Sequence, residues 1–391
     1  MIYGVAWSHR RCWGPLDATA ASYSAKTGEQ VHWNRRSLFS FGEDNLNGFV
    51  DTNDLIIFDH PFTGDIAQQG ILLDLKQFLS ADEIQMLEQN KVGASYESYK
   101  FDNGIWGLPI DAAATTAAWR PDLMAAASLE IPQTLEDVKR LAIEARTLNK
   151  WVGWAAKPTD LFCTYLSMLA SLGAPAGQND EAFVSREMNN FVIDQMRSLI
   201  PLVHPKSAEW NPIQILNHMA HNDDILYVPY TFNYVNYSTD DEGSIRFGSS
   251  PQMQKDLPAR GLLGGAGIGV SAKSQNPRAA FEYAMSLVNP DFQASEYVIH
   301  GGQPGMRSAW TSTECDKITN DFFSNCLQAM DDAYLRPTLP GFVNFFHEGT
   351  LRLSEVVNDG ASSTEFWSWL IRYYEILQRG AEEQAYAIQK P

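Results

Sequence analysis

The first hundred residues alternate apolar strand patterns with helix patterns, and this alternation limits the possible folds more than any other feature. Residues 2–7 and 54–58 are apolar runs, and an amphipathic pattern at residues 17–26 ends at Thr27-Gly28. An unbroken apolar run is typical of a strand buried on both faces, as in a parallel sheet. The alternation therefore predicts an α/β lobe with a mostly parallel sheet.

The ends of these two strands carry aromatic and polar residues. Trp7, Ser8 and His9 follow the first strand, and Asp59 and His60 follow the second. Ligands of α/β sheets bind outside the carboxyl ends of the strands, where an indole face and a carboxylate suit a polar ligand such as a sugar. We predict ligand contacts for these five residues. The alternatives are a core tryptophan beside surface polar residues, and an Asx-turn or loop cap at Asp59.

Size and charge exclude several classes of protein. The chain has 391 residues, 45% of them hydrophobic, with 29 basic and 47 acidic residues and a net charge of −18. This length predicts two domains with a sizeable core. The acidic balance argues against nucleic-acid binding and against charge-driven attachment to anionic membranes. No apolar run approaches the roughly 18 residues of a membrane span.

The amino terminus lacks the pattern of a secretory signal, because Met1 leads directly into the first predicted strand. A signal would show a basic start followed by an apolar stretch of about 7–15 residues. Two interpretations stay open: a cytoplasmic protein, or a chain that begins where a mature exported protein begins.

Cysteine and glycine patterns predict no cofactor and no metal. The cysteines are dispersed and show no metal-ligand spacing; Cys315 and Cys326 could pair, but free thiols are the favoured interpretation. Gly264-Gly265 precede a strand, whereas a dinucleotide fingerprint needs a glycine loop between strand and helix. These glycines instead let the backbone approach a ligand or turn between domains.

The remaining pattern is mixed α/β and becomes helical toward the carboxyl terminus. Asp102-Asn103-Gly104 predicts a hairpin turn, and residues 105–119 are extended. Ser80 and Thr134 are placed to cap helices. Further helices are expected over residues 158–173, 187–203, 278–287 and from 316 onward, and further strands over residues 227–230 and 268–270.

Five segments in order resemble a known family. They are residues 54–59 with 70–75, 99–111, 119–123 with 132–137, 264–269 with 276–281, and 302–305 with 333–337. Together they resemble the extracellular solute-binding proteins of the sugar-binding class, the maltose-binding-protein-like receptors of ABC importers. Asp74, Trp106 and Leu135 stand where the family usually has proline, tyrosine and tryptophan.

The resemblance implies a periplasmic-binding-protein-like fold, with two α/β lobes, a hinge and a ligand cleft between the lobes. Lobe one would comprise residues 1–110 and 262–310, and lobe two residues 114–260 and 315–391. Hinge crossovers are expected near residues 111–113, 257–261 and 310–315, and closure around a ligand is the motion typical of such proteins.

Further ligand contacts are expected near the crossovers. The family often places a polar contact at the position of Asp111, for which a structural hydrogen bond is the alternative. Tyr230, Asn233 and Tyr234 form an aromatic-polar cluster with Phe232 that suits a saccharide, although some of these rings are expected in the core. Gln303 and Arg307 lie in a loop near the crossover, and Gly264 and Gly265 complete the predicted ligand-binding set.

Arg10, Arg11, Arg35 and Arg36 are concentrated in the first lobe of an acidic protein. If two of them face the cleft, the ligand is an anion such as a sugar acid. Solvated surface charge is the favoured alternative.

The sequence therefore predicts a non-enzymatic, monomeric receptor without a catalytic residue. It would capture a small polar ligand, a carbohydrate or a derivative, for an ABC permease in the periplasm or at the cell surface. A glycoside-processing enzyme on the same scaffold remains an alternative, since two carboxylates across a cleft can hydrolyse a glycosidic bond. A cytoplasmic sensor relative with an anionic ligand is a further one.

Overall fold

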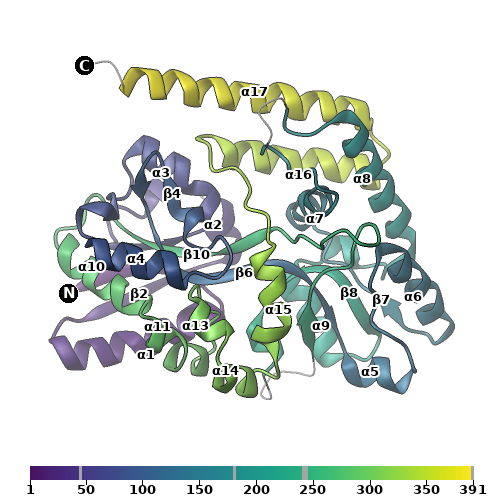
Figure 1. Cartoon of the computed structure of the whole chain (residues 1–391), viewed down its shortest axis with the longest axis horizontal. Coiled ribbons are helices and arrows are strands. Elements are labelled where there is room, and N and C mark those ends of the chain that lie inside the picture. The colour runs from purple at the N-terminus through teal and green to yellow at the C-terminus, as the bar shows by residue number, and fades with distance from the viewer. Residues whose placement is uncertain (44–45, 179–181, 240–244, 389–391) are drawn as a thin grey trace.

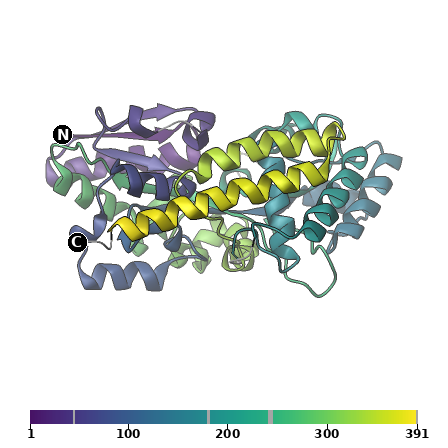
Figure 2. The same ribbon diagram turned by 90° about the horizontal axis from the view of Figure 1, so that it is seen from above.

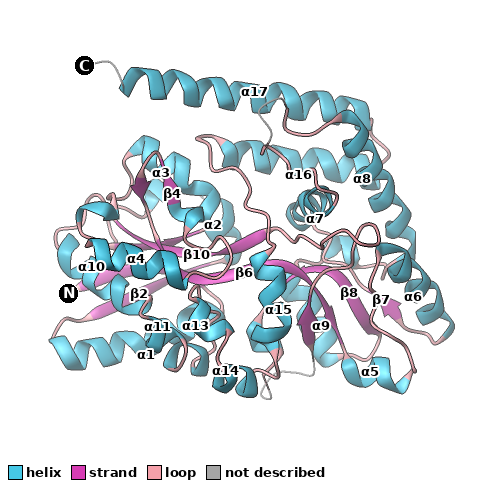
Figure 3. Cartoon of the chain, viewed as in Figure 1, coloured by secondary structure: helices cyan, strands magenta, loops and turns pink. Residues whose placement is uncertain are grey.

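One continuous sheet runs through the molecule, with helices packed on both sides (Figures 1 and 3). The computed structural model describes residues 1–43, 46–178, 182–239 and 245–388. The strand order is β2-β1-β3-β10-β6-β8-β7, with β9 paired to β6. The strands are β1 (Ile2–Trp7), β2 (Val31–Arg36), β3 (Leu55–Phe58), β6 (Leu108–Trp119), β7 (Trp151–Val152), β8 (Ile225–Phe232), β9 (Arg246–Gly248) and β10 (Leu263–Val270). Two short strands, β4 (Lys100–Phe101) and β5 (Gly104–Ile105), form a separate hairpin.

The sheet is mixed, so the expectation of a mostly parallel sheet holds only at its two ends. β1 is parallel to β2 and β3, and β7 is parallel to β8. β10 is antiparallel to both β3 and β6, and β6 is antiparallel to β8 and β9. The prediction concerned the first hundred residues, whose strands β1, β2 and β3 are parallel as expected. An apolar run indicates burial on both faces and not strand direction, so the antiparallel centre was not predicted.

β6 and β10 join the two halves of the sheet. β6 pairs with β10 through Ala114 and with β8 and β9 from Thr115 onward. The register shifts where Ala266 faces Asp111 and Gly267 faces Pro109. A bulge of this kind bends a strand and increases its twist. The bend therefore lies beside the crossover expected at residues 111–113.

The first lobe surrounds β2, β1, β3 and the second half of β10. Its helices are α1 (Arg10–Thr27), α2 (Leu38–Glu43), α3 (Thr63–Gln69), α4 (Ala81–Asn90) and α10 (Pro277–Leu287). Ser80 and Glu83 form the predicted capping box of α4. Asp102 and Asn103 have positive φ angles of 47° and 61°, as the predicted turn between β4 and β5 requires.

The second lobe surrounds the far half of β6 with β7, β8 and β9. Its helices are α5 (Pro121–Ala126), α6 (Leu135–Thr147), α7 (Pro158–Ser171), α8 (Arg186–Leu199), α9 (Pro212–His221), α16 (Phe342–Asn358) and α17 (Ser363–Ile388). The predicted cap at Thr134 is a full capping box with Asp137. α7 is buried along almost its whole length, because α8, α16 and the sheet cover it.

The segment between the lobes is a series of short helices below the sheet in Figure 1. They are α11 (Pro290–Gln293), α12 (Glu296–Ile299), α13 (Arg307–Trp310), α14 (Thr313–Ile318) and α15 (Phe322–Asp331). α17 runs over α16 and extends toward the first lobe (Figures 1 and 2). Among the described residues, no helix combines the length and the apolar character needed to cross a bilayer.

The thiols of Cys12, Cys163, Cys315 and Cys326 are all free and buried. The favoured interpretation of unpaired cysteines is therefore confirmed.

Candidate functional site

A cavity of about 550 Å³ lies between the lobes, over the paired strands β6 and β10. Both lobes contribute to its wall through strand ends, helix starts and loops. The lining residues are Trp7, Arg11, Leu38, Phe41, Gly42, Asp59, Pro61, Ala113, Lys157, Thr159, Asp160, Cys163, Asn211, Pro212, Phe232, Tyr234, Gly264, Gly265, Arg336, Val343, Asn344, Phe346 and His347. The volume is typical of a small-molecule site.

Five of the residues predicted to contact ligand line this cavity. Trp7 ends β1, Asp59 follows β3, Tyr234 follows β8, and Gly264 and Gly265 lie in β10. Gly265 has a φ of 127°, and an added Cβ would lie 2.4 Å from the carbonyl oxygen of Asp111. Only glycine therefore fits at this point of the cavity floor.

Arg11 and Asp111 form a buried ion pair beside the floor. Arg11 donates from Nε and Nη2 to the two Asp111 oxygens, each at 2.8 Å, and from Nη1 to the carbonyl of Asn233 at 2.9 Å. Burial disfavours the charge of Arg11, but the Asp111 carboxylate outweighs it and raises the pKa of Arg11. The guanidinium lies over the Tyr234 ring at 4.3 Å, which orients that ring at the cavity wall.

Asn233 and Gln303 form hydrogen bonds with the backbone of β6 near the crossover expected at residues 111–113. Asn233 Oδ1 accepts hydrogen bonds from the Ala114 amide at 3.2 Å and from Gln303 Nε2 at 3.0 Å. Gln303 also donates to the Ala112 carbonyl at 2.8 Å and accepts from the Val235 amide at 2.9 Å. Both side chains are fully buried. These amides therefore tie β6 to the chain after β8 and to the loop before α13.

Asp59, His60 and Arg336 form a second polar cluster, of which Asp59 and Arg336 line the cavity. Arg336 donates from Nη2 to Asp59 at 3.1 Å and from Nε to His60 Nε2 at 3.3 Å. His60 Nδ1 lies 3.1 Å from Asp59 Oδ1. Burial opposes the charge on Asp59, but Arg336 and His60 outweigh it and lower its pKa. Burial lowers the pKa of His60, so that ring is a neutral link between the other two groups.

The start of α7 supplies a second carboxylate to the cavity. Pro158 is the first residue of α7, and Lys157, Thr159 and Asp160 line the wall there. Burial raises the pKa of Asp160 to about 8, against the opposing charge of Lys157. Asp160 is therefore mainly protonated at neutral pH and can donate as well as accept a hydrogen bond.

Sequence reasoning missed most of the second-lobe wall. Lys157, Asp160, Asn211, Asn344 and His347 all lie at or near the first turn of a helix that faces the cavity. The available signals were proline at the first helical position in Lys157-Pro158 and Asn211-Pro212. Arg336 was part of a recognised motif without a predicted contact.

The structure places the other predicted contacts outside the residues that line this cavity, in the part of the chain it describes. His9 caps α1 by accepting the Arg11 amide at 3.2 Å, and burial lowers its pKa to about 4. Tyr230 packs in the second-lobe core with its hydroxyl 3.5 Å from Met253 Sδ. Arg307 pairs with Asp331 below the sheet. None of the remaining five lines the cavity: Ser8 is exposed, whereas His60, Asp111, Asn233 and Gln303 are buried.

Arg11, Arg35 and Arg36, three of the arginines that suggested an anionic ligand, contact groups of the protein itself. Arg11 is neutralised by Asp111. Arg35 pairs with Asp17 at the surface, at 2.5 Å. Arg36 donates to the carbonyls of Ile57 and Ser40, at 2.7 Å and 3.2 Å. Of the four, only Arg11 lines the cavity.

One group of described residues has the composition of a metal site. His204, His218 and Asp224 have ligand atoms within 4.8 Å of one another at the outer edge of the second lobe. They do not line the cavity.

Comparisons with known structures agree with the two-lobed architecture. The chain is similar to maltose-bound MalE3 of T. maritima, with a TM-score of 0.80 and 15% identity over 96% of this chain and 99% of that one. It is similar to an ABC transporter solute-binding protein of Agrobacterium radiobacter K84 in complex with ribitol, with a TM-score of 0.78 and 16% identity over 98% of each chain. It is also similar to the GacH receptor of Streptomyces glaucescens, with a TM-score of 0.77 and 14% identity over 96% and 99%.

No curated protein matches this chain. The family model of the bacterial extracellular solute-binding proteins matches residues 45–294, which is more than half of the chain. The chain therefore belongs to the family of bacterial extracellular solute-binding proteins.

Proposed function

We propose that this protein is the carbohydrate receptor of an ABC importer and that it binds its ligand in the cavity between the lobes. The observation that carries the proposal is the composition of the wall. The rings of Trp7, Phe232, Tyr234 and Phe346 stand beside charged and amide groups on both lobes. Aromatic faces pack on the CH faces of a sugar, while carboxylates and amides bind its hydroxyls. The similar structures include complexes with maltose, ribitol and acarbose.

The lobes close around the ligand by bending β6 and β10. The bulge at Ala266 and Gly267 is a local weak point in the pairing of these strands. Residues 1–110 with 262–310 would move against residues 114–260 with 315–391. Gln303 and Asn233 hold β6 in place near residues 112–114, so the motion would be a rotation about this point rather than a separation of the lobes.

A neutral sugar fits the wall better than a strongly anionic ligand. Arg11 and Arg336 are each paired with a carboxylate, Asp111 and Asp59. Lys157 is the remaining lysine or arginine among the lining residues. A single acidic group on the ligand would be placed at Lys157, at the start of α7.

A glycoside-processing enzyme is the second candidate, and one observation favours it. Asp59 and Asp160 line the same cavity, and their surroundings push their pKa values apart, downward at Asp59 and upward at Asp160. A general acid and an ionised partner need such a pair. Release of reducing sugar from glycosides, abolished by Asp160→Asn, would establish this function instead.

A thermal-shift screen against neutral sugars, polyols and sugar acids tests the receptor proposal, with isothermal titration for each hit. A ligand that binds only the folded protein raises the melting temperature. Asp59→Asn should remove the shift by weakening contacts in the cavity. Arg35→Gln, at a surface ion pair, is the matched control and should retain it. Binding that survives loss of both Asp59 and Trp7 would place the ligand elsewhere.

The family description implies a site of action outside the cell, where the protein would deliver its ligand to a permease. The net charge of −18 is compatible with a freely diffusing monomer. Ligand-stimulated ATP hydrolysis by the cognate importer in vesicles tests the transport role.

A further inference from the structure

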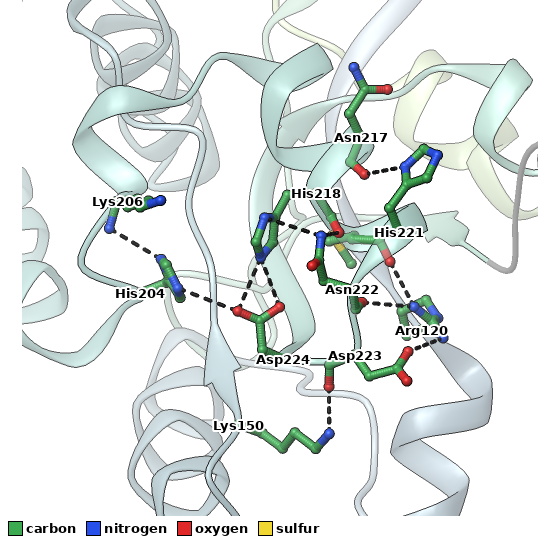
Figure 4. A network of polar contacts seen from close by, with 11 residues as sticks. Arg120, Lys150, His204, Lys206, Asn217, His218, His221, Asn222, Asp223 and Asp224 are labelled. Atoms are coloured by element: carbon green, nitrogen blue, oxygen red, sulfur yellow. Dashed lines mark hydrogen bonds and ion pairs between the residues drawn. The ribbon is translucent and has the colours of Figure 1, made fainter.

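Two histidines of the second lobe, His204 and His218, share the carboxylate of Asp224 (Figure 4). His204 follows the short helix Ile200–Leu202, His218 lies in α9, and Asp224 precedes β8. His218 Nε2 lies 2.8 Å and 3.0 Å from the two Asp224 oxygens. His204 Nε2 lies 3.5 Å from Asp224 Oδ2.

Trp210 connects these side chains to the cavity. Its ring stacks on His204 at 4.8 Å and lies 4.7 Å from the His218 ring. The next two residues, Asn211 and Pro212, line the cavity. The Trp210 carbonyl accepts the amide of Lys157 at 3.2 Å, and Lys157 lines the cavity as well. The two histidines therefore pack against Trp210, and the residues that follow it, Asn211 and Pro212, line the cavity.

The hydrogen bonds assign the ring protons. His204 Nδ1 accepts the Lys206 amide at 3.1 Å, so its proton lies on Nε2 and points to Asp224. Asn222 Nδ2 lies 3.4 Å from His218 Nδ1 and donates to the His218 carbonyl at 2.9 Å, which fixes the amide orientation. His218 therefore also carries its proton on Nε2.

This proton arrangement opposes a metal ion, although the three groups are close together. A metal-bound histidine presents a lone pair at one ring nitrogen and donates its other N–H to an acceptor. Here both Nδ1 atoms face donors, and both Nε2–H groups face the carboxylate. The group is built to hold protons at fixed positions.

We propose that His204, His218 and Asp224 form a proton-responsive clamp on the Trp210–Pro212 segment, and that acid weakens ligand binding by releasing it. A second proton on His204 adds an N–H at Nδ1, which faces the Lys206 N–H and breaks that hydrogen bond. The effect on the ligand rests on the receptor function proposed above; the clamp itself does not.

The charges around His204 come from each element packed against it. Lys206 lies on its own loop, His218 on α9 and Asp224 before β8. On the side of β7, the Trp151 ring contacts the His204 ring edge-on, with 5.4 Å between the ring centroids. The guanidinium of Arg146 in α6 lies 4.6 Å from the centroid of the Trp151 ring. Beside Asp224, Asp223 pairs with Arg120 at 3.0 Å, and its carbonyl accepts from Lys150 at 2.6 Å.

The direction of the pH effect follows from these surroundings. Burial lowers the pKa of His204, Asp224 opposes this, and His218 and Lys206 lower the pKa further. Because the unfolded chain takes up the proton more readily, the His204 contribution to stability is lost as pH falls below about 6.5.

The clamp is tested first on the ligand-free protein. Melting temperatures are measured between pH 5 and 8 for the native protein and for His204→Asn, which keeps an acceptor near Nδ1 but cannot titrate. The melting temperature of the native protein should fall further between pH 8 and pH 5 than that of the variant. The control is His221→Asn, at an exposed position on α9, the helix that carries His218. Its melting temperatures should follow the native pH profile. Equal profiles for His204→Asn and the native protein would overturn the clamp.

Two further measurements test the clamp in other ways, and the first uses only the native protein, so it does not depend on the folding of a variant. In the native protein, the ¹³Cε1 signal of His204 should titrate with a pKa below the ordinary histidine value of 6.5, and a midpoint at or above that value would overturn the proposal. A rise in melting temperature with Zn²⁺ that both His204→Asn and His218→Asn abolish would replace the clamp by a metal site.

The coupling to the cavity is tested with a sugar identified in the thermal-shift screen. Its affinity should fall between pH 7.5 and 5.5 in the native protein and fall less in His204→Asn. An equal fall in both would overturn the coupling. If no sugar binds, the receptor proposal fails, while the ligand-free measurements still decide whether the clamp exists.

Discussion

At the scale of single residues, four charged groups near the cavity are held in two ion pairs. Arg11 neutralises Asp111, and Arg336 neutralises Asp59 through direct contacts. Neutral pairs of this kind can orient sugar hydroxyls without requiring a charged ligand. Asp160 is the exception, because its raised pKa makes it a neutral acid at physiological pH.

Arg11→Ala should strongly destabilise the protein, because it leaves the Asp111 carboxylate buried without its partner. The expected loss is about 3–5 kcal/mol of unfolding free energy. Urea denaturation at pH 7 measures it. Arg35→Ala, which breaks an exposed pair with Asp17, should cost less than about 1 kcal/mol. Similar losses for the two variants would show that the buried pair does not matter more than the surface one.

Asp160→Asn should change how stability depends on pH. The pKa of Asp160 is about 8 in the folded chain, above its ordinary value of 3.8, so the folded state binds this proton more tightly than the unfolded state. Its contribution is complete at acid pH and falls as pH rises toward 8. The asparagine variant should therefore lose less stability between pH 5 and 8. Thermal melts across this range provide the measurement, and an unchanged slope would contradict the assignment.

At the scale of elements, the β6–β10 pair contributes both the cavity floor and the connection between lobes. The bulge in β10 directly follows Gly264 and Gly265. These two glycines let β10 pass close to Phe232 and to Asp111. The sequence predicted a strand over residues 268–270 and a close backbone approach at Gly264 and Gly265, but it did not predict which groups these glycines would approach.

Gly265→Ala should destabilise the protein more than Gly28→Ala. Both glycines have positive φ angles, 127° and 80°, but an added Cβ at Gly28 meets nothing within 4 Å. At Gly28 we expect a loss of about 1 kcal/mol from the backbone conformation alone. Gly265→Ala adds a contact of 2.4 Å with a backbone oxygen, which β6 or β10 must move to relieve. Chemical denaturation compares the two, and an equal cost would show that the floor is looser than described.

At the scale of the whole molecule, the chain crosses between the lobes several times, and the cavity exists only where these crossings meet. Its wall combines residues from Trp7 to His347, which come from nearly the full length of the chain. Closure of such a site must move large parts of the molecule together.

Ligand binding should therefore make the protein more compact. Small-angle X-ray scattering with and without a sugar from the thermal-shift screen measures the radius of gyration, which we expect to fall. Asp59→Asn, which weakens binding, should need more ligand for the same change. A saturating ligand that leaves the scattering curve unchanged would show that the lobes are already closed without it.

The sequence was enough to predict the mixed α/β composition, most element positions and the family resemblance, because these depend on local periodicity, caps and turns. The capping boxes at Ser80 and Thr134 and the hairpin at Asp102-Asn103 are examples. The strand pattern of the sequence also predicted that Trp7 and Asp59 follow strands whose ends lie at the cavity. Strand direction at the sheet centre depends on the tertiary fold, and so does the selection of polar groups that face the ligand cavity. Asp111, Asn233 and Gln303 had suitable chemistry but pair with groups distant in sequence, whereas Lys157 and Asp160 reach the wall because α7 packs end-on to it. Side-chain direction depends on contacts between remote segments, and local pattern carries no record of those contacts.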